Sequence, residues 1–176
     1  TYTLAEDGIQ ILYTVTNPGT EPMYYQLGAH PGFNCPLQSR ERFEDYILEF
    51  EQEETARYHS YDLTLMEFDM NSYTQILDHA SIIPLTHKLF ANDAIFFTDL
   101  RSKKVALKNP ATGQGVEVSY PDFATVAFWT AAATKAPFLC VEPWNGSAIR
   151  SDEDDNFLNR HFLQEVDGGE SKTYRL

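Results

Sequence analysis

The sequence predicts an all-β protein made of antiparallel strands, on the strength of three observations. Short runs of alternating polar and apolar residues recur along the chain, turn residues separate them, and no segment keeps a helical apolar stripe over the length of an ordinary helix. Many short strands at such spacing are typical of an antiparallel sandwich or barrel rather than of an alternating α/β fold. At 176 residues, we expect a single domain over residues 1–176.

Each expected element follows from local pattern and turn chemistry. The run at residues 9–17 alternates and then stops at a Pro-Gly turn. In residues 46–51, Tyr46, Leu48 and Phe50 share one face, and glutamates lie on the other. Further strands are expected as a hairpin in residues 105–118, at 125–129, at 137–142, and at 172–176, where a last strand could close the sheet. Residues 86–92 and 155–160 could each form a helical turn or two.

Composition and charge exclude several classes of function. Apolar residues make up 43% of the chain and aromatic residues 14%, as in a folded globular protein. The formal net charge of −13 repels phosphate backbones and anionic membranes, and no glycine-rich phosphate loop is present. We therefore expect a neutral small-molecule ligand, with no nucleic-acid and no membrane partner. No apolar run approaches a membrane span and no signal-peptide pattern is seen, which predicts a cytoplasmic protein.

Two further features have simple interpretations. Cys35 and Cys140 do not have the spacing of a metal site, and buried thiols are favoured over a disulfide, which the sequence leaves open. The acidic run SDEDD at residues 151–155 is predicted to be a solvated loop, because its spacing departs from the ligand pattern of a calcium-binding EF-hand.

Two short motifs carry the candidate chemistry. In QLGAHPGFN (residues 26–34), His30 lies between glycines and a proline that fix its position, although it could simply be a hydrogen-bonded histidine in a tight corner. In VEPWNG (residues 141–146), Glu142 ends an apolar run, where a carboxylate is costly unless it is paired or faces a polar cavity. Trp144 could stack on a sugar ring or could equally belong to the core, with Glu142 bonded to backbone amides.

Together, the histidine and the glutamate form a pair that could act as acid and base without a metal or a nucleophile. Such a pair suits the exchange of the α and β anomers of a pyranose. The base removes the proton of the anomeric hydroxyl while the acid protonates the ring oxygen, and the opened aldehyde then recloses on its other face. Each group typically contributes about 10²–10⁴-fold to the rate.

Four segments in order give the chain a family resemblance. They are LGAHPGFNCPL, FEDYILEFE, IPLTHKLFANDAIFF and APFLCVEPWNG. With them the chain resembles the aldose 1-epimerase (galactose mutarotase-like) family, in its LacX-like branch. The resemblance implies a β-sandwich of the galactose mutarotase type that takes a free hexose and needs no cofactor and no metal.

The resemblance also assigns roles to particular residues. His30 matches the general acid that protonates the ring oxygen, and Glu142 matches the general base at the anomeric hydroxyl. Asp93 matches an acidic residue that binds sugar hydroxyls, although Asp99 lies nearby in the chain. Phe33 and Trp144 are expected to wall the sugar site.

In two places the chain departs from the family pattern. It resembles only the C-terminal portion of the family domain, so we expect a sandwich that is incomplete at its N-terminus. The absent part supplies an arginine and a second histidine, which a missing N-terminal segment or another subunit would have to provide. The second departure is Ile149, which stands where the branch commonly has an acidic residue.

Two other functions stay open at this point. A non-catalytic carbohydrate-binding protein would keep the aromatic wall and the hydroxyl-binding groups without the catalysis. A sugar-phosphate epimerase is disfavoured by the net charge of −13, because Arg150 is the only cation near the two motifs in the sequence.

Overall fold

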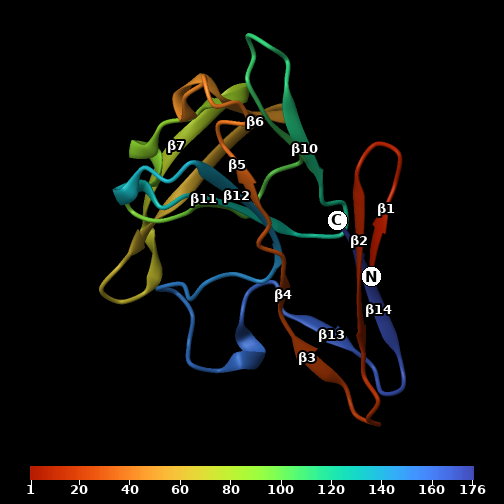
Figure 1. Ribbon diagram of the computed structural model, residues 1–176. Coiled ribbons are helices and arrows are strands. Elements are labelled where there is room, and N and C mark those ends of the chain that lie inside the picture. Colours follow the sequence, from red (N-terminus) through yellow and green to blue (C-terminus); the bar gives the residue numbers. More distant parts are fainter.

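The computed structural model describes residues 1–176, and its regular secondary structure is mostly antiparallel strands (Figure 1). One sheet has the strand order β10-β9-β6-β7. Its strands are β6 (Ile47–Asp62), β7 (Glu67–Pro84), β9 (Lys104–Lys108) and β10 (Gly115–Ser119). A second sheet has the order β4-β12-β11-β8, and β5 pairs farther along β12. Its strands are β4 (Leu27–Gly28), β5 (Gly32–Asn34), β8 (Ile95–Phe97), β11 (Thr125–Trp129) and β12 (Phe138–Asn145).

The remaining strands form two small sheets beside this pair. One joins β1 (Tyr2–Leu4), β2 (Ile9–Thr16) and β14 (Ser171–Arg175), and the other joins β3 (Met23–Tyr25) and β13 (Gln164–Val166). Both chain ends lie along β2, because Leu12 N donates to Thr1 O and Ile11 N donates to Leu176 O. Four short 3-10 turns complete the chain: η1 (Phe43–Asp45), η2 (His87–Phe90), η3 (Ala132–Thr134) and η4 (Phe157–Asn159).

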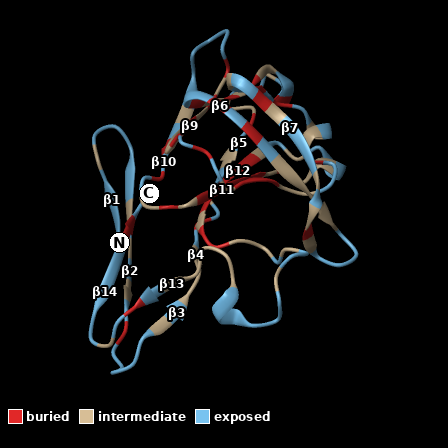
Figure 2. Cartoon of the chain, turned by 180° about the vertical axis from the view of Figure 1, so that it is seen from behind, coloured by how far each residue is buried: buried red, intermediate tan, exposed pale blue.

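The main core lies between the two large sheets, as expected when two alternating sheets bury one face each. Inward residues of β6 and β9, such as Leu48 and Val105, belong to the same buried cluster as Phe128 and Leu139 of β11 and β12. Figure 2 shows the buried residues gathered in this layer, whereas the sheet of β1, β2 and β14 is largely exposed. The arrangement is that of an antiparallel β-sandwich.

The outer face of the five-stranded sheet is the one that matters for function. Successive side chains of a strand point to opposite faces. On β12, Leu139 and Val141 therefore point into the main core, and Cys140 and Glu142 point to the outer face. The register between β11 and β12 sets Ala127 directly opposite Glu142.

The expected elements are largely confirmed. The hairpin, the strands at β11 and β12 and the closing strand β14 lie where the alternation predicts them, and both helical segments are single 3-10 turns. The strand expected at residues 46–51 continues to Asp62, and its partner β7 was not predicted. No helix of the protein is long and apolar enough to cross a membrane.

Candidate active site

The structure brings His30 and Glu142 together at the outer face of the five-stranded sheet. His30 lies between β4 and β5, which both pair with β12, so its ring is held over the strand that carries the glutamate. The imidazole Nε2 is 3.3 Å from Glu142 Oε1. The histidine side chain is 60% exposed and that of the glutamate only 4%, so the pair joins a buried carboxylate to a solvent-facing imidazole.

The surroundings of Glu142 shift its carboxyl group toward a change of charge near neutral pH. Burial raises the pKa of its carboxyl group to about 7, and the negative charge of Asp93 adds to the increase. Apart from the imidazole of His30, no side chain forms an ion pair with the carboxylate, and no protein group donates a hydrogen bond to it. A buried carboxylate with so few partners is costly, and groups with a shifted pKa are concentrated at functional sites.

Asp93 follows η2 and contributes a second carboxylate to this region. Its backbone has φ of +83°, a conformation that aspartate and asparagine tolerate better than most residues. Its Oδ1 accepts a hydrogen bond from Ala94 N at 2.8 Å. Because the charge of Asp93 acts on Glu142, its side chain lies near the pair, whereas Asp99 is exposed and is not among the charges that shift Glu142.

Trp144 and Phe33 lie on opposite faces of the sheet. Trp144 is on the outer face, where its ring packs 5.4 Å from that of Phe96, and its Nε1 donates to Ala29 O at 3.2 Å. The indole therefore offers a ring face rather than a free donor, and it borders a groove of about 320 Å³. Phe33 pairs with Leu139 and packs against the main core. The structure does not bring Phe33 to the His30–Glu142 pair.

Sequence reasoning missed two aromatic residues, one beside His30 and one whose pKa responds to Asp93. Trp129, at the end of β11, lies edge-to-face with His30 at 6.1 Å between ring centroids. Trp129 lies two residues after Ala127 and therefore on the same outer face of the sheet. The sequence shows this only once the register between β11 and β12 is known. Tyr61, near the turn of the β6–β7 hairpin, has its pKa raised by burial and by the charge of Asp93. Nothing in the local sequence connects that hairpin to Asp93.

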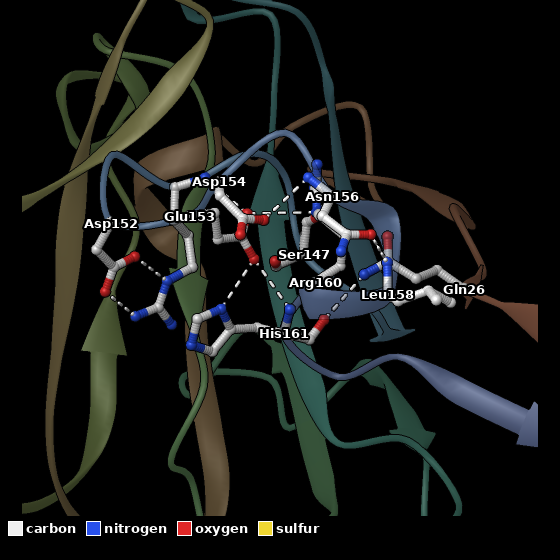
Figure 3. Close-up of polar contacts among 10 residues, drawn as sticks. Gln26, Ser147, Asp152, Glu153, Asp154, Asn156, Leu158, Arg160 and His161 are labelled. Carbon is white, nitrogen blue, oxygen red and sulfur yellow. Dashed lines mark hydrogen bonds and ion pairs between the residues drawn. The ribbon is translucent and has the colours of Figure 1, made fainter.

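The acidic run at residues 151–155 is not simply the solvated loop that its composition predicts. The side chain of Glu153 is only 2% exposed and is paired with Arg160 and His161. Figure 3 shows Glu153 at the centre of this cluster, with Asp152 at its edge. Backbone N–H groups of Arg150 and His161 also donate to Glu153. The other four residues of the run are exposed, so the prediction is wrong for this one side chain.

The same cluster occupies both arginines next to the site. Arg150 binds Asp152 through two hydrogen bonds, and Arg160 Nε lies 3.3 Å from Glu153 Oε2. Each guanidinium therefore has a carboxylate partner within its own loop.

Both cysteines are free and buried, which confirms the thiol interpretation. Cys35 belongs to the main core. Cys140 lies two residues before Glu142 on the outer face, and its sulfur, His30 and Glu142 bring their ligand atoms within 4.8 Å of one another. These three residues are the group on the outer face that could hold a metal ion.

The fold defines the class of protein: a β-sandwich of the galactose mutarotase type. The family model for aldose 1-epimerase matches residues 1–154, and the chain belongs to this family. The chain is 36% identical over 153 residues to the chromosomal LacX protein of Lactococcus lactis subsp. lactis, and equally to the plasmid-encoded LacX protein. These matches cover 86% of the chain but 51% of each LacX protein, so the chain spans about half the length of these curated relatives.

Solved structures agree with this family. A galactose mutarotase related enzyme from Lactobacillus acidophilus superimposes with a TM-score of 0.88 at 26% identity, over 99% of the chain and 57% of the enzyme. A galactose mutarotase-like protein from Lactobacillus casei superimposes with a TM-score of 0.81 at 25% identity, over 99% of the chain and 59% of that protein. The expected all-β fold of the galactose mutarotase type is thereby confirmed.

Proposed function

We propose that the protein is an aldose 1-epimerase that interconverts the α and β anomers of a free hexose. The observation that carries this proposal is the contact of 3.3 Å between His30 Nε2 and Glu142 Oε1. The ring oxygen and the anomeric hydroxyl of a pyranose are bonded to the same carbon. An acid and a base so close together can therefore act on both oxygens at once.

The proposed reaction needs only proton transfers. Glu142 takes the proton of the anomeric hydroxyl, His30 gives a proton to the ring oxygen, and the bond between the anomeric carbon and the ring oxygen breaks to leave the aldehyde. Rotation about the first carbon–carbon bond presents the other face. On reclosure, His30 takes back its proton from the attacking hydroxyl, and Glu142 returns its proton to the new anomeric oxygen.

The surroundings of the pair support a neutral sugar as substrate. Asp93 supplies a carboxylate for sugar hydroxyl groups, and Trp144 together with Trp129 supplies aromatic surface on either side of Glu142 along the sheet. Because Arg150 and Arg160 are paired with carboxylates of their own loop, their charges are already compensated, which disfavours a phosphorylated sugar. Phe33 is not part of this wall.

Polarimetry of freshly dissolved α-glucose and α-galactose tests the proposal. The folded protein is expected to speed the approach to anomeric equilibrium in proportion to its concentration. No acceleration by a protein shown to be folded by circular dichroism would contradict the proposal. Saturation-transfer NMR on the same sample identifies the alternative, a non-catalytic carbohydrate-binding protein, which would bind the sugar without faster exchange.

A further inference from the structure

The strand pairing brings three different metal-binding atoms together beside the acid/base pair. Cys140 and Glu142 lie on the same face of β12, and Gly32 lies opposite Cys140, where a Cβ atom would be 3.4 Å from the sulfur. His30, two residues before Gly32, lies between β4 and β5, on the same edge of β12 as Gly32. The imidazole nitrogen, the thiol sulfur and the carboxylate oxygen all lie within 4.8 Å of one another.

These separations are close to those required by one tetrahedral zinc ion. Nitrogen and oxygen ligands at about 2.0–2.2 Å from zinc lie about 3.3 Å apart, and sulfur at about 2.3 Å lies about 3.6 Å from an oxygen ligand. His30 Nε2 and Glu142 Oε1 are already 3.3 Å apart. The sulfur needs to approach by no more than about 1.2 Å, which rotation of the exposed histidine and of the thiol can supply.

The donor set and the local charge select the kind of cation. One sulfur, one nitrogen and one carboxylate oxygen suit a borderline ion such as Zn²⁺, whereas Mg²⁺ and Ca²⁺ need six or more oxygen ligands. The carboxylate of Glu142 has no lysine or arginine partner, and Asp93 adds negative charge close by. A divalent cation would compensate both carboxylates, and the solvent-facing side of His30 leaves a fourth position for water.

We propose that His30, Cys140 and Glu142 form a binding site for one zinc-type divalent cation, and that this cation blocks the acid/base pair when bound. The metal would occupy the nitrogen that donates a proton to the sugar and the oxygen that accepts one. The site is therefore inhibitory rather than catalytic. Cys140 takes no part in the proposed sugar chemistry. Replacing its thiol is therefore expected to weaken metal binding without removing a group that the reaction needs.

Cadmium titration tests the binding claim without any need for activity. Cd²⁺ resembles Zn²⁺ in its preference for thiolate, and a bound thiolate gives a cadmium charge-transfer band in the ultraviolet. The wild-type protein is expected to bind one Cd²⁺ with this band, and Cys35→Ala is expected to keep the band. Cys140→Ala is expected to lose the band and to bind Zn²⁺ at least about tenfold more weakly by calorimetry.

Two results would overturn the binding claim: no cadmium band in the folded wild-type protein, or a band that survives in Cys140→Ala. If Cys140→Ala does not fold, Cys140→Ser provides the same comparison with less change in volume. His30→Asn is expected to weaken Zn²⁺ binding as well while leaving the thiol in place.

The inhibition claim rests on the proposed function and is tested separately. Zn²⁺ is expected to slow anomer exchange at concentrations that match its measured binding, a chelator is expected to restore the rate, and Cys140→Ala is expected to keep the metal-free rate but resist Zn²⁺. Binding without inhibition would contradict the blocking role. Absence of exchange in the metal-free protein would contradict the proposed function and leave the cadmium result to decide the site.

Discussion

Gly28 lies directly opposite Trp144 in the register between β4 and β12, and the indole occupies the space that a side chain at Gly28 would need. A Cβ atom there would overlap Trp144 Cδ1. The glycine therefore fixes how the tryptophan lies on the outer face, two residues from Glu142.

Replacing Gly28 with alanine is expected to displace Trp144 and to lower kcat/KM for anomer exchange at least about tenfold. The reason is that a displaced indole no longer holds the sugar in the orientation that reacts. Gly8→Ala is the matched control, since a Cβ atom at Gly8 meets nothing within 4 Å. Steady-state kinetics on both variants checks this. Equal kcat/KM in the two variants would show that the position of Trp144 does not matter for the sugar site.

The pH dependence of the reaction follows from the pKa of Glu142, which burial and Asp93 raise to about 7. A base must be ionised to accept a proton, so the rising limb of kcat/KM is expected to climb about tenfold per pH unit up to about pH 7. The pH profile of kcat/KM measures this directly. A rise centred near the ordinary glutamate value of 4.5 would contradict the assignment of Glu142 as the base.

The same pKa makes Glu142 a cost to stability at neutral and alkaline pH. Because the carboxyl group binds its proton more tightly in the folded state, the folded protein is favoured below about pH 4.5, and this advantage is lost as the pH rises to about 7. The loss is on the order of 3 kcal/mol. Glu142→Gln should therefore be more stable than wild type at pH 8, with the difference vanishing near pH 4.

Urea unfolding of both proteins at the two pH values measures this difference. Equal unfolding free energies at pH 8 would show that the buried carboxylate is compensated in a way that the contacts of His30 and Asp93 do not explain.

Asp93→Asn is expected to change both the binding of the sugar and the pKa of Glu142. Asparagine tolerates the positive φ of this position, so the backbone is kept while the charge is removed. Loss of the charge should shift the rising limb of the pH profile to lower pH, because Asp93 raises the pKa of Glu142. Loss of a charged hydrogen bond to the sugar should raise KM about tenfold.

Asp99→Asn is the control for that change, since Asp99 lies nearby in the chain but is not among the charges that shift Glu142. If the two variants gave the same pH profile and the same KM, the assignment of Asp93 to the sugar site would be wrong.

Local pattern predicted the strands that form either a regular alternation or a short continuous apolar run. β11 and β12 are strongly apolar and lie where they were expected. The β6–β7 hairpin was largely missed because its ladder shifts register several times after Glu49, which breaks the two-residue period. Its outer half carries polar residues on both faces, so no alternation marks it.

The residues of the site that stand within a single sequence motif were predictable. His30 and Glu142 stand out because of their immediate neighbours, and the structure brings them together. The face on which an aromatic residue lies depends instead on pairing with a distant strand, which no local pattern reveals. Phe33 was assigned to the sugar wall for this reason, although its pairing with Leu139 turns it to the core, and Trp129 was overlooked. The burial of Glu153 depends on His161 and Arg160 in the same way.

The measurement that tests the central claim most directly is exchange NMR between the α and β anomeric protons of galactose and glucose. The wild-type protein should raise the exchange rate, and Glu142→Gln and His30→Asn should each reduce that increase at least about a hundredfold while keeping the wild-type circular dichroism spectrum. His79→Asn, at an exposed histidine on β7, should exchange at the wild-type rate. Wild-type rates in both Glu142→Gln and His30→Asn would show that this pair is not the acid and base of the protein.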